Sequence, residues 1–375
     1  MIRRLRVKNF KCFEDEEILF QPLTLLSGLN GMGKSTVIQS LLLLRQSYLQ
    51  GLLQKKLIAL NGDLTSLGTA SNVLFEDSKE ERIAFEIELV NKIQARWTFK
   101  YDREADVLEQ ISPRVSRQVF RDSLFLDQFH YLQAERIGPR TSFDMSDYQV
   151  RQHRQLGSRG EYAAHFLHQF GTSQSVLEKI KHPKAKSIDL RDQTEAWLSE
   201  ISPGARIDVR PYSEMDLVNL QYSFEHGKQV SNPYRSTNTG FGITYALSVL
   251  VAVLSSDIDA LVLLENPEAH LHPQGQVRVG RLIALAASCG VQIVVETHSD
   301  HLLNGIRLAV YDSELAPTDV SLNFFERRDY DNISRVVVTT PQIDKDGRID
   351  HWPEGFFDEW EKSLDALLRT KDKWQ

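Results

Sequence analysis

Hydrophobic and polar positions alternate with a period of two in the first third of the chain. Residues 2–10 set leucine and valine between arginines and lysine, which predicts a first strand with one face in water and its cations on that solvated face. The alternation returns between about residues 81 and 112, in IAFEIELV and RWTFKYD, as in antiparallel strands that lie beside a core. This part of the chain therefore predicts an antiparallel β subdomain.

A different pattern begins after residue 239, where fully apolar runs alternate with segments of helical spacing. The runs ALVLLE and VQIVVE predict buried strands, and GFGITYALSVLVAVL, QGQVRVGRLIALAAS and DHLLNGIRLAV predict helices. Strands that are apolar on both faces are typical of parallel sheets with helices on both sides. Together with the N-terminal part, this predicts an α/β fold with a mixed sheet.

Helical spacing also marks residues 160–204, which contain EYAAHFLHQF and QTEAWLSEI on either side of HPKAKS. This segment is far too short for a long coiled coil, and no stretch of the chain has the composition of a linker. We therefore expect residues 1–375 to form one domain with a small inserted helical lobe at 160–204.

Composition narrows the class of protein without identifying a partner. The chain of 375 residues is 41% hydrophobic, enough for a large core. It has no membrane-spanning apolar run and no signal-peptide stretch, so we expect a cytoplasmic protein that does not enter the membrane. Two cysteines are too few for a disulfide framework or a structural zinc site. The net charge of -7 leaves any contact with nucleic acid to local basic patches.

The stretch SGLNGMGKST, residues 27–36, follows a short apolar strand and precedes a helical segment. It fits the G-x-x-x-x-G-K-[ST] phosphate loop, in which glycines turn backbone N–H groups toward phosphates at a helix N-terminus. Lysine at this position reaches the β and γ phosphates, and serine places its hydroxyl on Mg²⁺. The residues expected to line the nucleotide are Asn30, Gly31, Gly33, Lys34, Ser35 and Thr36.

Acidic residues end the two apolar strands of the C-terminal half. Glu265 ends LVLLE, where a carboxylate can hold the Mg²⁺ of a loop-bound nucleotide. Glu296 ends the next strand, and His298 follows in ETHSDHLL, where it could donate to a γ-phosphate or a water. A metal cluster is the alternative for the histidines of this region, which are His270, His272, His298 and His301.

These motifs, in this order along the chain, resemble the ABC-type ATPases of the SMC, RecF and OLD group, bacterial relatives often labelled AAA-family ATPases. GLNGMGKST, STNTGFGITYALSVL, LLENPEAHLHP and VVETHSDHLL carry the resemblance. YLQAERIGPR, ENPEAHLHPQGQ, ETHSDHLLNGIR and WPEGFFDEW extend it to a small subfamily with a C-terminal domain of uncharacterised function, which assigns residues 318–375 to a family-specific extension. The resemblance implies a P-loop NTPase fold of the ABC-ATPase type.

In that group two heads sandwich two ATP molecules, and the signature helix of each head caps the nucleotide of the other. The resemblance places that signature at residues 238–242, with Thr239, Gly240 and Gly242 facing the nucleotide, although LSGGQ itself is absent. A glycine-started core helix is the alternative for this segment. The resemblance also makes His298 the switch histidine and Gln133 a match for the glutamine that senses Mg²⁺.

Two arginines in AERIGPR, Arg136 and Arg140, are candidates to face phosphate, and a structural ion pair is the alternative for each.

Asn266 departs from the family pattern, because relatives that have EEP or DEP place the glutamate that polarises the attacking water there. Asparagine can orient a water but cannot accept its proton. We therefore expect slow or partner-triggered hydrolysis, in which Glu268 or Glu296 supplies the carboxylate.

The region expected of a nuclease is also missing, because OLD-type nucleases continue into a metal-dependent nuclease domain and fewer than 70 residues follow DHLLNGIRLAV here. We expect no built-in nuclease. The candidate nucleic-acid surface is residues 136–160, where arginines lie near Phe143 and Tyr148, with a solvated loop as the alternative. Four lysines between 179 and 186 make a second, smaller basic patch.

The sequence thus predicts an ATP-binding and slowly ATP-hydrolysing switch that uses Mg²⁺ and assembles as a homodimer or higher homo-oligomer. The resemblance adds a separately encoded effector protein, such as a nuclease, nucleic acid as a further candidate partner, and a role in bacterial anti-phage defence or DNA maintenance. The alternative from another class is a nucleotide-bound scaffold with negligible hydrolysis, which Asn266 favours. The ATPase subunit of a membrane transporter fits less well, because the signature is loose and a tail follows the switch histidine.

Overall fold

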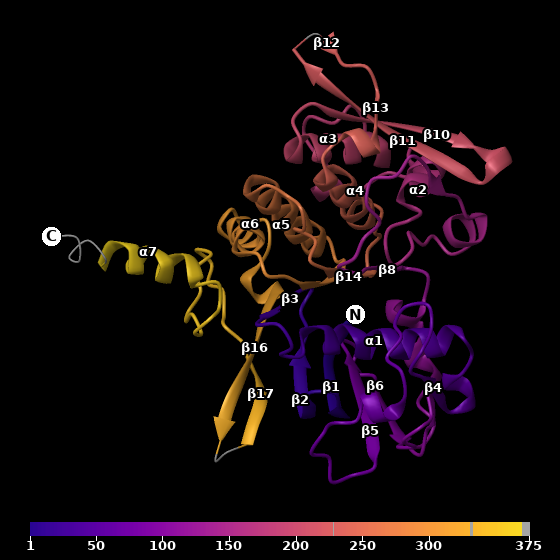
Figure 1. Cartoon of the computed structure of the whole chain (residues 1–375), viewed down its shortest axis with the longest axis vertical. Helices are drawn as coiled ribbons and strands as arrows, with labels where there is room; N and C mark the ends of the chain where they lie inside the picture. The colour runs from indigo at the N-terminus through magenta and orange to yellow at the C-terminus, as the bar shows by residue number, and fades with distance from the viewer. Residues whose placement is uncertain (228, 331–332, 370–375) are drawn as a thin grey trace.

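A six-stranded sheet crosses the middle of the molecule in the computed structural model, which describes residues 1–227, 229–330 and 333–369 (Figure 1). The strand order is β17-β16-β3-β15-β14-β8, with β17 antiparallel to β16 and the other neighbours parallel. The strands are β3 (Leu23–Gly28), β8 (Phe129–Leu132), β14 (Leu261–Glu265), β15 (Gln292–Glu296), β16 (Val320–Tyr330) and β17 (Ile333–Thr339).

The central strands bury side chains on both of their faces. On β14, Val262 and Leu264 join one hydrophobic core, whereas Leu261 and Leu263 join the other. Because successive residues of a strand point to opposite faces, a continuous apolar run supplies both cores at once. The sheet is therefore the wall between two cores.

An antiparallel sheet and helix α1 (Lys34–Leu49) cover one face, as the N-terminal alternation predicts. Its order is β2-β1-β5-β6, from β1 (Ile2–Phe10), β2 (Phe13–Leu19), β5 (Arg82–Leu89) and β6 (Gln94–Lys100). A two-stranded sheet of β4 (Leu57–Ala59) and β7 (Val107–Glu109) lies beside it.

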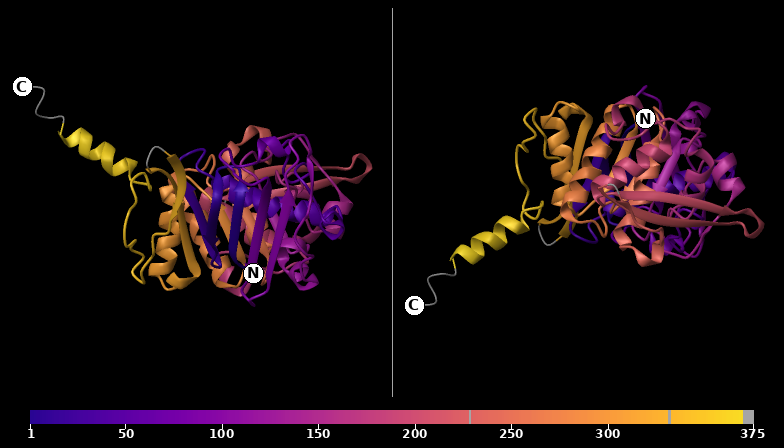
Figure 2. Two further views of the ribbon diagram at one scale, coloured as in Figure 1. Left: turned by 90° about the horizontal axis from the view of Figure 1, so that it is seen from below. Right: turned by 90° about the horizontal axis from the view of Figure 1, so that it is seen from above.

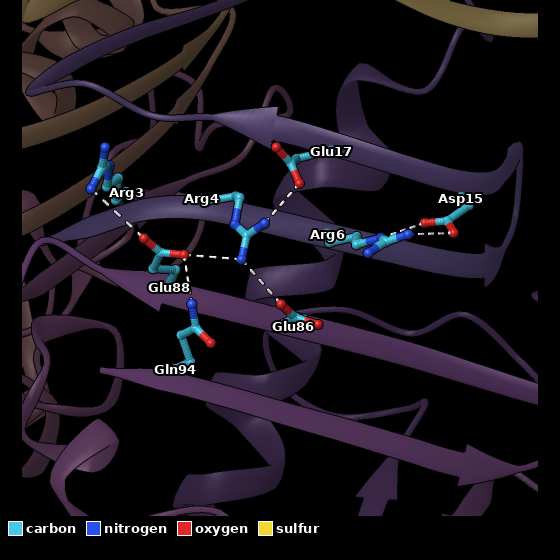
Figure 3. A network of polar contacts seen from close by, with 8 residues as sticks. All are labelled: Arg3, Arg4, Arg6, Asp15, Glu17, Glu86, Glu88 and Gln94. Carbon is cyan, nitrogen blue, oxygen red and sulfur yellow. Dashed lines mark hydrogen bonds and ion pairs between the residues drawn. The ribbon is translucent and has the colours of Figure 1, made fainter. Parts of the chain in front are cut away.

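The cations of β1 lie on the outer face of this antiparallel sheet, as expected, and are paired across the strands (Figure 3). Arg4 contacts Glu17 at 2.9 Å and Glu86 at 3.1 Å, and Arg6 contacts Asp15 at 2.7 Å. Exposed pairs of this kind contribute about 0–1 kcal/mol each. These ion pairs join side chains of neighbouring strands but contribute little to the free energy of folding.

Helices cover the opposite face of the central sheet (Figures 1 and 2). Three of them, α4, α5 and α6, follow from the helical spacing of the C-terminal half. Two more, α2 and α3, lie within residues 160–204 and pack against a small sheet in which β11 is central. The helices are α2 (Ala163–Phe170), α3 (Leu190–Ile201), α4 (Phe241–Leu254), α5 (Pro273–Ser288) and α6 (Asp300–Tyr311).

The small sheet consists of β9 (Phe143–Asp144), β10 (Ala205–Tyr212), β11 (Leu217–His226), β12 (Gln229–Val230) and β13 (Tyr234–Arg235). The last helix within the described residues is α7 (Glu359–Arg369), which extends away from the body of the molecule in all three views (Figures 1 and 2). The part of the chain after residue 369 lies outside the described residues.

Candidate functional site

The phosphate-loop motif lies between β3 and α1, as the sequence predicts. Gly28, Gly31 and Gly33 have φ values of 136°, 78° and 101°, which side chains with a Cβ rarely adopt. A Cβ at Gly28 would lie 2.2 Å from the carbonyl oxygen of Phe325, and one at Gly33 would lie 2.7 Å from Cys12 Sγ. The loop is therefore pressed against β16 and the β1–β2 turn, and glycine is needed for that approach.

Lys34 folds back over its own loop. Its Nζ donates to the carbonyl oxygens of Gly28 at 2.9 Å and Leu29 at 2.8 Å, and only 3% of the residue is exposed. Burial lowers the pKa of Lys34, and the charge of Glu296 opposes that shift. Of the other predicted loop residues, Asn30 and Gly31 are exposed and Thr36 is buried.

Three carboxylates gather at the carboxyl ends of β14 and β15. Glu265 and Glu296 are direct partners in the parallel register of the two strands, and Glu268 follows in the turn after β14. Burial raises the pKa of all three, and that of Glu296 reaches about 7 because the charge of Glu265 adds to the burial. The strand order thus gathers side chains that are far apart in the sequence.

Ser35 and Glu296 are in direct contact. The hydroxyl of Ser35 lies 3.0 Å from Oε1 and 2.9 Å from Oε2 of Glu296. The sequence predicts Glu265 as the carboxylate partner of Ser35 at a magnesium site, whereas in the structure the serine faces the carboxylate of the next strand.

Glu265 is held by residues that the sequence analysis did not select. The hydroxyl of Tyr131 donates to Oε1 at 2.9 Å, and the backbone N–H of Ala134 donates to Oε2 at 3.1 Å. Tyr131 belongs to β8, which pairs with β14, and Ala134 follows two residues after the strand ends. Gln133, predicted to sense Mg²⁺, donates through its side chain to the carbonyl oxygen of Glu135 at 3.2 Å, and its role toward Mg²⁺ stays a prediction.

Arg136 is buried and forms no ion pair with a carboxylate among the described residues, so the predicted ion pair is not seen there, and its role toward phosphate stays a prediction. It is 1% exposed and donates to the carbonyl oxygens of Glu265 and Asn266, each at 2.8 Å. Arg140 has an exposed side chain, and its backbone N–H and C=O bond the hydroxyl of Ser236. The AERIGPR segment therefore fastens the turn after β14 to the loop before α4.

Asn266 lies in the turn after β14 with a φ of 44°, in the left-handed region that asparagine tolerates better than most residues. Its backbone N–H donates to the carbonyl oxygen of Glu296 at 2.8 Å. Its side-chain Oδ1 is buried and accepts no hydrogen bond from the described residues. Asn266 thus joins the ends of β14 and β15 and keeps one acceptor free.

His298 follows β15, and its backbone N–H donates to Oε1 of Glu268 at 3.0 Å. The residue as a whole is exposed, but partial burial of its imidazole, together with the charge of Lys34, lowers the pKa of His298. Among the residues that the structure describes, no group of three or more His, Cys, Asp or Glu side chains is arranged to hold a metal ion. The histidine cluster considered as an alternative does not form there.

The predicted signature segment begins α4. Thr239 donates to the carbonyl oxygen of Ser236 at 2.8 Å, and a Cβ at Gly242 would lie 2.5 Å from the carbonyl oxygen of His270. A Cβ at Gly240 would meet nothing within 4 Å. The start of α4 therefore packs on the turn after β14 at Gly242 and is open to solvent at Gly240.

The candidate basic surface at residues 136–160 is largely paired within the chain. Arg151 contacts Asp147 at 2.9 Å, and Arg159 contacts Glu135 at 2.9 Å. Arg154 donates to Gln174 and lies 4.2 Å from the ring centroid of Phe170. Phe143 is buried, whereas Tyr148 is 65% exposed. Three of the four lysines in the second patch also pair with glutamates, namely Lys181, Lys184 and Lys186.

Comparison with protein-family models gives two matches. Residues 23–304 match a family described as "AAA domain, putative AbiEii toxin, Type IV TA system". Residues 315–367 match "Protein of unknown function (DUF3696)". Within the described part of the chain, no helix combines the length and the apolar character needed to cross a membrane.

A curated relative is the OLD nuclease of Thermus scotoductus, which is 46% identical over 41 residues. That stretch is 11% of this chain and 8% of the OLD nuclease, so the likeness spans a small part of the relative's length.

Two solved structures share the fold. The SMC head bound to the C-winged helix domain of ScpA is 17% identical with a TM-score of 0.55, and the alignment covers 90% of this chain and 97% of that one. The Smc head of Pyrococcus furiosus, solved with the C-terminal domain of ScpA, is 14% identical with a TM-score of 0.52, and 98% of each chain is covered.

Proposed function

We propose that this protein is an ATP-binding switch whose chains pair around the nucleotide. The proposal starts from its family, because the chain belongs to the AAA-domain family whose model matches residues 23–304. It is an ATPase of the AAA, SMC and OLD type. The observation that carries the proposal is the meeting of the phosphate loop with the carboxylates of β14 and β15, where Ser35 lies against Glu296. Slow hydrolysis of ATP is part of the proposal, as is a cytoplasmic location.

The loop is suited to exchange its internal contacts for a phosphate chain. Lys34 donates to the two loop carbonyls of Gly28 and Leu29, and a phosphate oxygen would offer it a charged acceptor and a stronger hydrogen bond. The start of α1 adds positive potential and backbone N–H groups. Asn30 and Gly31 lie at the exposed rim of the loop, where they would contact the same phosphates.

The side chains near the loop also suit a magnesium ion. Mg²⁺ prefers oxygen ligands and is usually held by one or two carboxylates together with substrate phosphates and water. The Ser35 hydroxyl and the carboxylates of Glu265 and Glu296 are the oxygen groups from which such ligands could come. Bound there, the ion would neutralise charge on the β and γ phosphates.

Hydrolysis is expected to be slow because Asn266 replaces the glutamate of relatives. An asparagine amide that turns toward the site can orient the attacking water but does not take up its proton, and the buried Oδ1 has no hydrogen bond within the described residues that would have to break. The carboxylates of Glu268 and Glu296 are the candidates to accept that proton, and Glu268 remains for this role if Glu296 binds the cation. His298, close enough to Lys34 for their charges to interact, is the candidate donor to the γ-phosphate.

Pairing of two chains rests on the exposed start of α4. The helix N-terminus at Gly240 is open to solvent, so its N–H groups and dipole can face a phosphate held by a second chain. Thr239 and Gly242 flank that position. From the resemblance we further propose a separately encoded effector, in anti-phage defence or DNA maintenance.

A scaffold that binds ATP without appreciable hydrolysis is the second candidate, because Asn266 removes the usual carboxylate. In that case ATP stabilises the paired chains, which hold a partner protein.

Steady-state release of phosphate from Mg-ATP separates the two candidates. The native protein, Lys34→Ala and Asn266→Glu are compared with and without double-stranded DNA. Turnover in the native protein that is lost in Lys34→Ala supports the switch, and stimulation by DNA adds nucleic acid as a trigger. Turnover only in Asn266→Glu supports the scaffold. Measurable turnover that is equal in the native protein and in Lys34→Ala contradicts both candidates, because the activity would then not depend on the phosphate loop.

A further inference from the structure

The position of Glu296 in the sheet makes it the carboxylate nearest to the phosphate loop. Strand β15 lies between β3, which leads into the loop, and β14, which ends at Glu265. Glu296 is in register with Leu26 of β3 on one side and with Glu265 of β14 on the other. Because neighbouring strands are about 4.8 Å apart, Glu265 starts one strand spacing farther from the loop than Glu296 does.

Glu296 turns both of its carboxylate oxygens toward Ser35, as a carboxylate does when both oxygens bind one ligand. A serine hydroxyl has one proton and can donate it to one acceptor at a time. Both carboxylate oxygens nevertheless lie about equally close to the hydroxyl, at 3.0 and 2.9 Å. Glu296 is therefore aimed at the place where the loop serine would hold a cation.

Glu265 has less freedom to take a cation, because its two oxygens already accept bonds from Tyr131 and Ala134. Tyr131 is 8% exposed. If Glu265 turned away, the tyrosine hydroxyl would be left buried without a hydrogen-bond acceptor. Glu296 would give up only its contact with Ser35, and a cation bound between them replaces that contact. The exchange at Glu296 leaves no buried polar group unpaired.

We infer that Glu296, rather than Glu265, is the carboxylate that takes the divalent cation together with Ser35, and that Glu265 positions the end of β8. Without the cation, the carboxylate of Glu296 accepts the hydrogen bond that the hydroxyl of Ser35 donates. The inference rests on the proposed function, since the cation enters with the nucleotide.

The test measures how much Mg²⁺ is needed for tight binding of a fluorescent ATP analogue. The native protein, Glu296→Gln and Glu265→Gln are first titrated with the analogue in EDTA, and the Mg²⁺ concentration at half-maximal effect is then determined. We expect Glu296→Gln to bind the analogue in EDTA at least as well as the native protein and to need about tenfold more Mg²⁺ or above. Glu265→Gln should need less than about threefold more.

A double-mutant cycle with Ser35→Ala checks that the two residues act on one cation. The shifts in the Mg²⁺ midpoint for Ser35→Ala and Glu296→Gln should not add, because they remove ligands of the same ion. Thermal unfolding of each variant without nucleotide shows whether it is folded, and Glu296→Asp provides a variant that keeps the charge.

Three results would overturn the inference: an unchanged midpoint in Glu296→Gln, a larger shift in Glu265→Gln, or fully additive shifts. Failure of the native protein to bind the analogue under any condition would instead overturn the proposed function.

Discussion

Arg136 donates a 2.8 Å hydrogen bond to the carbonyl oxygen of Asn266, and so a buried cation holds the backbone of the turn after β14. The same guanidinium lies 5.1 Å from the ring centroid of Tyr245 in α4. The ring centroid of Tyr245 in turn lies 4.7 Å from the ring centroid of His270. One side chain therefore links the turn after β14 to the helix that begins with the predicted signature.

Replacement of Arg136 by methionine should destabilise the protein. Two backbone carbonyls of a buried turn would lose their donor, and each such loss costs about 1–3 kcal/mol. Chemical denaturation should show a fall in the free energy of unfolding of about 3 kcal/mol. Arg140→Met is the matched control, since that side chain is exposed and should change stability little. Equal losses in the two variants would show that Arg136 does not hold the turn.

Asn266→Glu should raise phosphate release and lower stability together. A carboxylate at this position can accept the proton of the attacking water, an effect of about 10²-fold or more in known enzymes. Glutamate tolerates a φ of 44° less well than asparagine, at a cost of about 1 kcal/mol. Asn266→Asp is the control that keeps the backbone preference. Unchanged turnover in both variants, with both folded, would exclude this position as the site of the missing base.

The two glycines at the start of α4 should respond differently to alanine. Gly242→Ala places a Cβ 2.5 Å from the carbonyl oxygen of His270, so the helix must shift, at a cost of about 2 kcal/mol. Gly240→Ala meets open space and should cost less than about 1 kcal/mol. Thermal unfolding distinguishes them, and similar melting temperatures would contradict the close packing of α4 on the turn.

His130 should make the fold sensitive to acid. Burial lowers the pKa of this histidine from 6.5 to about 3, with the charges of Arg154 and Arg45 adding to the shift. The unfolded chain therefore takes up a proton below pH 6.5 that the folded chain does not, so the contribution is present above pH 6.5 and is lost as pH falls toward 3.

The measurement is the slope of unfolding free energy against pH for the native protein and His130→Leu. Between pH 6 and 4 the variant should lose less stability per pH unit, by about 1 kcal/mol. Parallel curves would mean that His130 titrates alike in both states.

Much of the fold follows from local patterns. The α/β class with a mixed sheet of the ABC-ATPase type is confirmed by the SMC-head structures and the family match. ALVLLE and VQIVVE form β14 and β15 because residues that are apolar on both faces need a core on each side. The division into a lobe at 160–204 and an extension at 318–375 stays a prediction.

The arrangement of the site was less accessible from the sequence. Ser35 and Glu296 are 261 residues apart, and only the strand order brings them together. Tyr131 and Arg136 reach the site because β8 pairs with β14, which no local pattern of FHYLQAERIGP reveals. The pairing within the basic surface at 136–160 was hidden for a similar reason, since Arg154 contacts a ring and an amide from elsewhere in the chain, and the role of this surface toward nucleic acid stays a prediction.

Binding of Mg-ATP to the native protein and to Lys34→Ala, measured by titration calorimetry, tests the central claim most directly. We predict one ATP per chain in the native protein and affinity at least about tenfold lower in Lys34→Ala, which loses the charged hydrogen bond to phosphate. A circular-dichroism melt verifies that the variant is folded. Equal affinities, or no binding by the native protein, would contradict the claim that the loop at 28–36 holds ATP.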